Sequence, residues 1–159
     1  MQKIKIISVL MLFLLVINGR SQSTSNNTDF PLWVNSFDKA KIIASQKDVA
    51  ILLFFTGTDT CLNCSKMRQN ILDTKEFITY SRNSFVMFQV DYPNSKKNNL
   101  LPSQIKKNKA LVLKYNPSGK LPQIVVIDAK GNLKASANFL DIPVSEYLPQ
   151  FKALLNMFK

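Results

Sequence analysis

Two cysteines, Cys61 and Cys64, are the residues of this chain whose type and spacing could do chemistry. They are the only cysteines among its 159 residues, and the chain has no histidine. A zinc site normally needs four Cys or His ligands, so a single chain cannot complete one, and a Cys–His nucleophilic pair is excluded as well. Two cysteines that are separated by two residues leave thiol–disulfide exchange as the main chemistry.

The pair could instead be a structural disulfide or two inert buried thiols. A disulfide that closes a four-residue loop stabilises a fold little, because the loss of chain entropy grows with loop length. A chain of this length can also bury an adequate hydrophobic core without covalent cross-links. Redox exchange is therefore the favoured interpretation, and the inert pair is the alternative.

The position of the pair along the chain supports redox chemistry. A buried strand and a polar turn precede it, and we expect a helix to begin at or just before Cys61. Unpaired N–H groups of the first helical turn and the helix dipole would favour the thiolate of Cys61, while Cys64 lies one turn later on the same face and could resolve a mixed disulfide. Lys66 and Arg68 add positive charge nearby, and Asp59 opposes it.

The remaining patterns predict an α/β protein. The unbroken apolar run 49–55 predicts a strand buried on both faces, and so the middle of a sheet with helices above and below it. Residues 128–131 are typical of a hairpin turn with glycine at the position that needs a positive φ. Helical spacing is found in residues 32–46, 75–80, 103–115 and a last helix from Pro143 or Val144. The first of these helices could be capped by Asp29 or Asn35, so its start stays open. Further strands are predicted at 85–91, 124–127 and 133–138, with a loop at 93–99.

Residues 1–21 have the layout of a secretory signal peptide. Lys3 and Lys5 form a basic start, residues 4–17 are almost wholly apolar, and small residues follow. An apolar run of about 14 residues is shorter than the ~20 that span a bilayer, so an uncleaved membrane anchor is less favoured, and a core helix less still. We therefore expect cleavage after Ser21 and export.

The rest of the chain is expected to be a linker, residues 22–31, and one domain, residues 32–159. An apolar fraction of 46% and a charged fraction of 19% are those of a globular protein. Export would place this domain where disulfides can form and persist, and the bacterial periplasm is the compartment that fits best.

The chain is strongly basic. Its formal net charge is +11, and loss of Lys3, Lys5 and Arg20 with the signal would leave +8. Much of the excess lies between Lys96 and Lys120, and such a surface can bind nucleic acid, anionic lipid or acidic partners. Lysine outnumbers arginine there and few aromatic residues are interleaved, so nucleic acid is not expected as a partner. A solvated helix face is the favoured interpretation, and a docking face is the alternative.

The segment FFTGTDTCLNCSKM, residues 54–67, resembles the active-site segment of exported thioredoxin-like proteins, including the thioredoxin-like domain of thiol:disulfide interchange proteins. The resemblance extends over roughly residues 32–158. It implies a thioredoxin-like fold, with a central mixed β-sheet flanked by helices. It also implies a cis-proline loop that faces the two cysteines. Leu121–Pro122 stands in the matching place, so Pro122 would be cis and the Leu121 backbone would pair with a bound peptide.

The chain departs from the family pattern at several positions. Many relatives have Trp before the first cysteine, where this chain has Thr60. The buried acid of thioredoxin has no match, because Phe54 and Phe55 occupy that depth of the preceding strand. The dipeptide Leu62–Asn63 is not Gly–Pro and lacks the histidine of strong oxidants. These differences weaken any expectation of fast, general thioredoxin activity and favour a reductase or isomerase over a strong oxidase.

The sequence therefore predicts an exported thiol–disulfide oxidoreductase that reduces or isomerises protein disulfides. Cys61 is the expected nucleophile, Cys64 the resolving thiol, and Thr60, Leu121 and Pro122 the substrate-binding residues. Protein thiols or disulfides and an unidentified redox partner are the expected partners, with no metal or other cofactor and no spanning segment after signal cleavage. The alternative is a non-enzymatic thioredoxin-like binding module, and a metal- or haem-delivery role for two such sites that meet is a third, weaker hypothesis.

Overall fold

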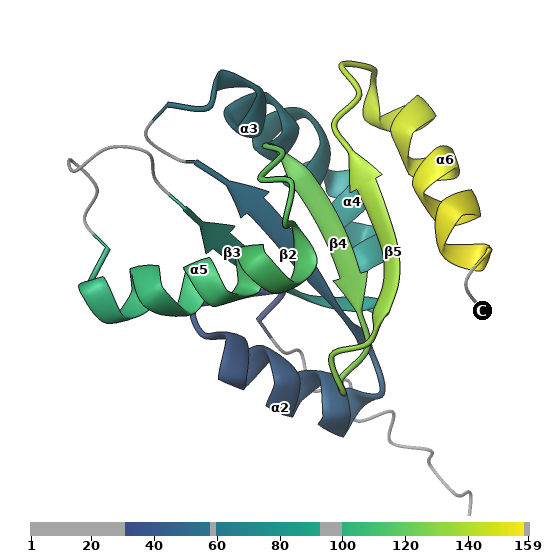
Figure 1. Ribbon diagram of the computed structural model, residues 1–159. Helices are drawn as coiled ribbons and strands as arrows, with labels where there is room; N and C mark the ends of the chain where they lie inside the picture. Colours follow the sequence, from purple (N-terminus) through teal and green to yellow (C-terminus); the bar gives the residue numbers. More distant parts are fainter. Residues whose placement is uncertain (1–30, 58–59, 93–99, 158–159) are drawn as a thin grey trace, which may run out of the picture.

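The computed structural model describes residues 31–57, 60–92 and 100–157, where the chain forms a five-stranded sheet with helices on both faces (Figure 1). The predicted signal peptide, nearly all of the linker and the predicted loop 93–99 lie outside the described residues. The strand order is β1 (Trp33–Val34), β3 (Phe85–Asp91), β2 (Ala50–Thr56), β4 (Gln123–Ile127) and β5 (Leu133–Asn138). Strands β1, β3 and β2 are parallel, and β4 is antiparallel to both β2 and β5. The predicted mixed sheet is confirmed.

Strand β2 is buried on both faces, as its unbroken apolar run predicted. Leu52 and Phe54 belong to one core cluster, and Ile51, Leu53 and Phe55 belong to the other. Because successive side chains of a strand point to opposite faces, only a strand with helices on both sides can bury such a run. The sheet therefore separates two hydrophobic cores, with β2 at its centre.

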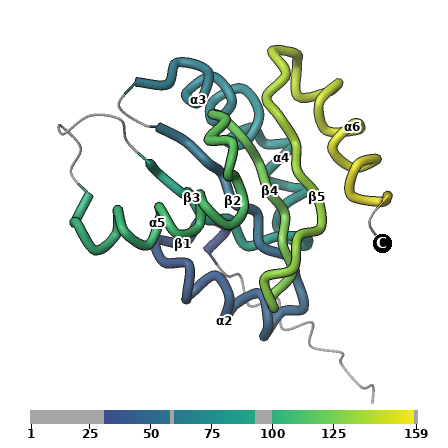
Figure 2. Tube along the Cα trace, in the orientation of Figure 1, coloured from purple at the N-terminus to yellow at the C-terminus, as the bar shows by residue number. Residues whose placement is uncertain are grey.

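Two layers of helices cover the two faces (Figures 1 and 2). Helices α2 (Phe37–Lys47) and α5 (Pro102–Tyr115) lie on one face. The other face is covered by α3 (Leu62–Met67), the π-helical turn η1 (Arg68–Leu72), α4 (Lys75–Ser81) and α6 (Val144–Asn156). The cysteine pair begins the second layer, since α3 leaves the end of β2.

The first predicted helix starts later than expected, and a strand precedes it. Trp33 and Val34 pair in parallel with β3, and the Leu32 carbonyl accepts a 2.7 Å hydrogen bond from the N–H of Met87. Trp33 packs against one core and Val34 lies in the other. Successive side chains point to opposite faces in a strand but not in a helix, so this arrangement requires a strand. A start at residue 32 was therefore wrong: the helix begins at Phe37, after its N-cap Ser36 and close to the alternative cap Asn35.

The hairpin at residues 128–131 is confirmed. Gly131 adopts a φ of 88°, which a residue with a side chain rarely tolerates. The Asp128 carboxylate accepts hydrogen bonds from the backbone and side chain of Asn132, and these bonds lower its pKa. This turn joins β4 to the edge strand β5.

Candidate active site

A tight turn at the end of β2 places Cys61 at the start of α3. The Gly57 carbonyl accepts hydrogen bonds from the N–H groups of Thr60, at 3.2 Å, and Cys61, at 3.0 Å. Cys61 is the N-cap of α3, with extended φ and ψ of −106° and 91°. The prediction that a helix begins at the cysteine pair is confirmed.

The two cysteines form a disulfide and differ in exposure. The Sγ–Sγ distance is 2.03 Å, and the Cα atoms are 5.2 Å apart. Cys64 is only 3% exposed and belongs to the same core cluster as Phe54, whereas Cys61 is partly exposed. The N–H of Cys64 donates a 3.1 Å hydrogen bond to the Sγ of Cys61. Such a bond would stabilise negative charge on the outer sulfur after reduction.

The two cations near the pair are each held by a carboxylate. The ammonium of Lys66 lies 2.9 Å from Asp141, and the guanidinium of Arg68 lies 2.7 Å from Asp73. Asp59, which was expected to oppose them, lies outside the described residues. Among the described residues, the backbone N–H of Cys64 is a donor that the structure directs at the outer sulfur.

The proline loop lies at the same end of the sheet as the cysteines. Because β4 is antiparallel to β2 and Gln123 pairs with Phe55, Leu121 and Pro122 stand beside the end of β2 (Figure 1). The Leu121–Pro122 peptide bond is cis, as the resemblance implied. Pro122 is buried and Leu121 is partly exposed. The structure therefore brings all five predicted site residues, including the exposed Thr60, to one end of the sheet.

Gly57 also belongs to this site, a role that was not predicted from the sequence. A Cβ atom at this position would lie 3.2 Å from Cδ1 of Leu121, 3.6 Å from the carbonyl oxygen of Tyr92 and 3.9 Å from Cβ of Cys61. The missing side chain lets the proline loop approach the cysteine turn. A glycine directly after a buried strand was the available signal, since it often marks a close approach of two chain segments.

Replacing Gly57 with alanine is expected to lower the free energy of unfolding by about 1 kcal/mol, because the added methyl group must displace the Leu121 side chain. Denaturant unfolding of the oxidised protein measures this change. A Leu121→Ala background removes the crowding atom, so Gly57→Ala should cost less there. Equal costs in the two backgrounds would show that the contact with Leu121 is unimportant.

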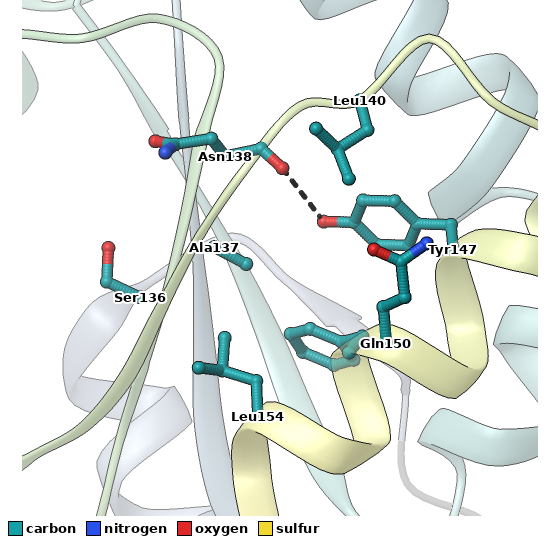
Figure 3. A pocket seen from close by; sticks show the side chains of 8 residues that line it. Ser136, Ala137, Asn138, Leu140, Tyr147, Gln150 and Leu154 are labelled. Atoms are coloured by element: carbon teal, nitrogen blue, oxygen red, sulfur yellow. Dashed lines mark hydrogen bonds between the residues drawn. The ribbon is translucent and has the colours of Figure 1, made fainter.

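A separate hollow of about 270 Å³ lies between β5 and α6 and contains none of the predicted site residues (Figure 3). Burial raises the pKa of Tyr147 well above its ordinary value, and its hydroxyl donates a 3.4 Å hydrogen bond to the Asn138 carbonyl. The lining includes no cysteine, and Tyr147 is its one titratable residue. The lining residues are Ser136, Ala137, Asn138, Leu140, Tyr147, Gln150, Phe151 and Leu154.

Over residues 31–57, 60–92 and 100–157, no group of three or more His, Cys, Asp or Glu side chains could hold a metal ion. In the same part of the chain, no helix is long and apolar enough to cross a membrane.

Comparison with known proteins decides the family. Residues 37–137 match the family model described as a thioredoxin-like domain. The chain belongs to the thioredoxin-like family. Its sequence is 34% identical over 122 residues to the disulfide bond reductase DsbH of Chlamydia pneumoniae. The aligned region covers 77% of this chain and 72% of that protein.

Solved structures of thioredoxin-like proteins agree with this assignment. The structure titled DsbH oxidoreductase is similar with a TM-score of 0.71 and 31% identity, over 86% of this chain and 93% of that one. The structure of a disulphide isomerase from Xylella fastidiosa Temecula1 has a TM-score of 0.55 at 15% identity, over 72% of this chain and 87% of that one. This likeness shows the shared fold alone. With its Cys61–Cys64 disulfide, this thioredoxin-like chain is a thiol–disulfide oxidoreductase. The oxidoreductase prediction is confirmed and is favoured over the non-enzymatic binding module.

Proposed function

We propose that the protein is an exported disulfide reductase in which Cys61 attacks the substrate and Cys64 resolves the intermediate. The observation that carries the proposal is the difference between a partly exposed Cys61 and a Cys64 that is 3% exposed. A substrate disulfide can approach the outer sulfur, while the inner sulfur is protected from solvent. The similarity to a protein named disulfide bond reductase supports the reducing direction.

The reaction begins with both cysteines reduced. The Cys61 thiolate attacks one sulfur of a protein disulfide, so the substrate S–S bond breaks, a mixed disulfide forms and one substrate thiolate leaves. Cys64 then loses its proton and attacks the Sγ of Cys61, which releases the second substrate thiolate and forms the Cys61–Cys64 disulfide. The substrate gains two electrons and two protons, and an external dithiol donor must return them to the protein.

Substrate contact is assigned to the residues that surround the outer sulfur. Thr60 is exposed directly before Cys61, and Leu121 lies partly exposed beside the turn. Pro122, buried directly before β4, would orient the Leu121 backbone toward an extended peptide of the substrate. Main-chain pairing of this kind is tolerant of sequence and suits protein substrates.

The proposed boundaries follow from the composition of the chain. Residues 1–21 would be removed as a signal peptide, residues 22–31 would form a linker, and residues 32–159 would form the working domain. Removal would release the domain into the periplasm, where disulfide substrates are available. Amino-terminal sequencing of the protein recovered from the periplasm would test cleavage after Ser21.

Equilibration with glutathione tests the reducing direction. We expect a reduction potential of about −230 mV or lower, since no histidine between the cysteines stabilises the reduced form. The oxidised fraction is measured by alkylating free thiols at each glutathione ratio and weighing the products by mass spectrometry. The Cys61→Ser variant provides the single-thiol baseline. A potential close to about −120 mV, typical of strong oxidants, would contradict the proposed direction.

A further inference from the structure

The outward surface of α2 and α5 is the most basic part of the described chain. Both helices lie on the same face of the sheet (Figure 1), with Ala40, Ile43, Ala44 and Leu111 buried against it. Their exposed residues point away from this core. We call this surface the lysine face and define it by five lysines and two aliphatic residues, Lys39, Lys41, Lys106, Lys109, Lys114, Ile42 and Leu113.

The charge of this surface is poorly compensated. Helix α5 has four lysines and no acidic residue, and α2 has three lysines and one acid, Asp38. The Asp38 carboxylate lies 3.3 Å from the ammonium of Lys41 and 3.8 Å from that of Lys107. Within the described part of the chain, Lys106 and Lys109 have no ion-pair partner. On the opposite face, α4 and α6 each carry one lysine and one glutamate.

Each helix also exposes one large aliphatic side chain among its lysines. Ile42 is 57% exposed on α2, and Leu113 is 66% exposed on α5. Both lie on the side of the helix away from the sheet, because the buried positions of the two helices face the core. A basic helix surface with isolated aliphatic residues can bind at the boundary between lipid headgroups and acyl chains.

We propose that the lysine face binds the surface of an anionic lipid bilayer. Lysine ammonium groups would contact the lipid phosphates while their alkyl stems lie along the headgroups, and Ile42 and Leu113 would enter the acyl boundary. Flexible lysines bind phosphates without a fixed bonding geometry, which suits a mobile layer of lipid headgroups. Bidentate recognition of a defined anion favours arginine instead.

Binding in this orientation is compatible with redox activity. Cys61 lies at the end of the sheet, and α3 leaves it across the face opposite to α2 and α5 (Figure 1). The outer sulfur would therefore remain open to protein substrates while the lysine face rests on the bilayer. The domain would work as a peripheral enzyme at a membrane surface.

Vesicle co-sedimentation tests this proposal with the mature chain from Gln22, which retains every helix and strand described above. Wild-type protein should bind vesicles of phosphatidylcholine with about 30% phosphatidylglycerol, and should not bind pure phosphatidylcholine. Because each lysine near such a surface contributes about fivefold to the partition constant, Lys106→Gln with Lys109→Gln should weaken binding about 25-fold. Raising the salt concentration should weaken wild-type binding as well.

The matched control removes the same charge from the opposite layer. Lys75→Gln with Lys152→Gln, on α4 and α6, should change the partition constant less than about threefold, and Ile42→Ser with Leu113→Ser should weaken binding at constant charge. Equal losses in both lysine pairs would overturn the proposal, since net charge alone would then explain binding. Binding to polyglutamate but not to anionic vesicles would overturn it in favour of an acidic protein partner. Vesicle binding does not depend on thiol chemistry, so neither success nor failure of this test affects the reductase proposal.

Discussion

Cys61→Ser is expected to lower the rate of disulfide reduction by about a thousandfold or more, to the rate of uncatalysed exchange. A serine hydroxyl does not attack disulfides at neutral pH, because the thiolate is the nucleophile of this reaction. The measurement is insulin reduction by dithiothreitol, followed by the turbidity of the freed chains. Wild-type protein should accelerate the reaction, and the variant should not.

Cys64→Ser is the matched control, because it also removes one sulfur and prevents the internal disulfide. This variant should still attack through Cys61 but should stop at the mixed disulfide, since the resolving thiol is missing. Mass spectrometry should find a substrate adduct on Cys64→Ser and none on Cys61→Ser. The reverse pattern would exchange the two roles, and wild-type rates in both variants would contradict the reductase proposal.

Phe54→Ala is expected to lower the free energy of unfolding by about 3–5 kcal/mol, a large part of the stability of a domain of this size. Phe54 is 2% exposed at the centre of the sheet, and its ring forms a T-shaped contact with that of Trp33, with centroids 6.4 Å apart. Removing the ring would leave a cavity in the same cluster that contains Cys64. Denaturant unfolding of the oxidised protein, monitored by circular dichroism, measures the change.

Leu133→Ala is the control for this stability prediction. Leu133 also lies in a strand, but it is 61% exposed on the edge strand β5, so its loss should change stability by no more than about 0.5 kcal/mol. Phe54→Leu, which keeps part of the buried volume, should fall between the two. Similar losses for Phe54→Ala and Leu133→Ala would show that the core around Cys64 is loosely packed.

Several elements could be predicted from the sequence because their signals are local. The run 49–55 is apolar at every position. A strand on the surface would expose half of these side chains, and seven residues are few for a helix, so a buried strand is the structure that fits. The turn that ends in Gly131 likewise depends on one residue that tolerates a positive φ. The position of Cys61 at a helix start followed from the polar turn, residues 56–60, that separates it from the run 49–55.

The short strand β1 could not be predicted in the same way. Two residues cannot establish a period, and the apolar spacing after Leu32 fitted a helix equally well. The conformation of Trp33 and Val34 was decided by the free edge of β3, to which they bind through parallel pairing. The crowding at Gly57 is non-local for the same reason, since Leu121 lies far away in the sequence.

The sequence by itself limited the chemistry of this protein to thiol–disulfide exchange or an inert cysteine pair, and favoured exchange, because it has two cysteines in a CxxC spacing and no histidine. Only the tertiary structure decided which sulfur is exposed, that Lys66 and Arg68 are already paired, and that Gly57 admits Leu121 to the site. Residue types and spacing limit the available reactions, whereas burial and close contact depend on segments that meet only when the sheet is assembled.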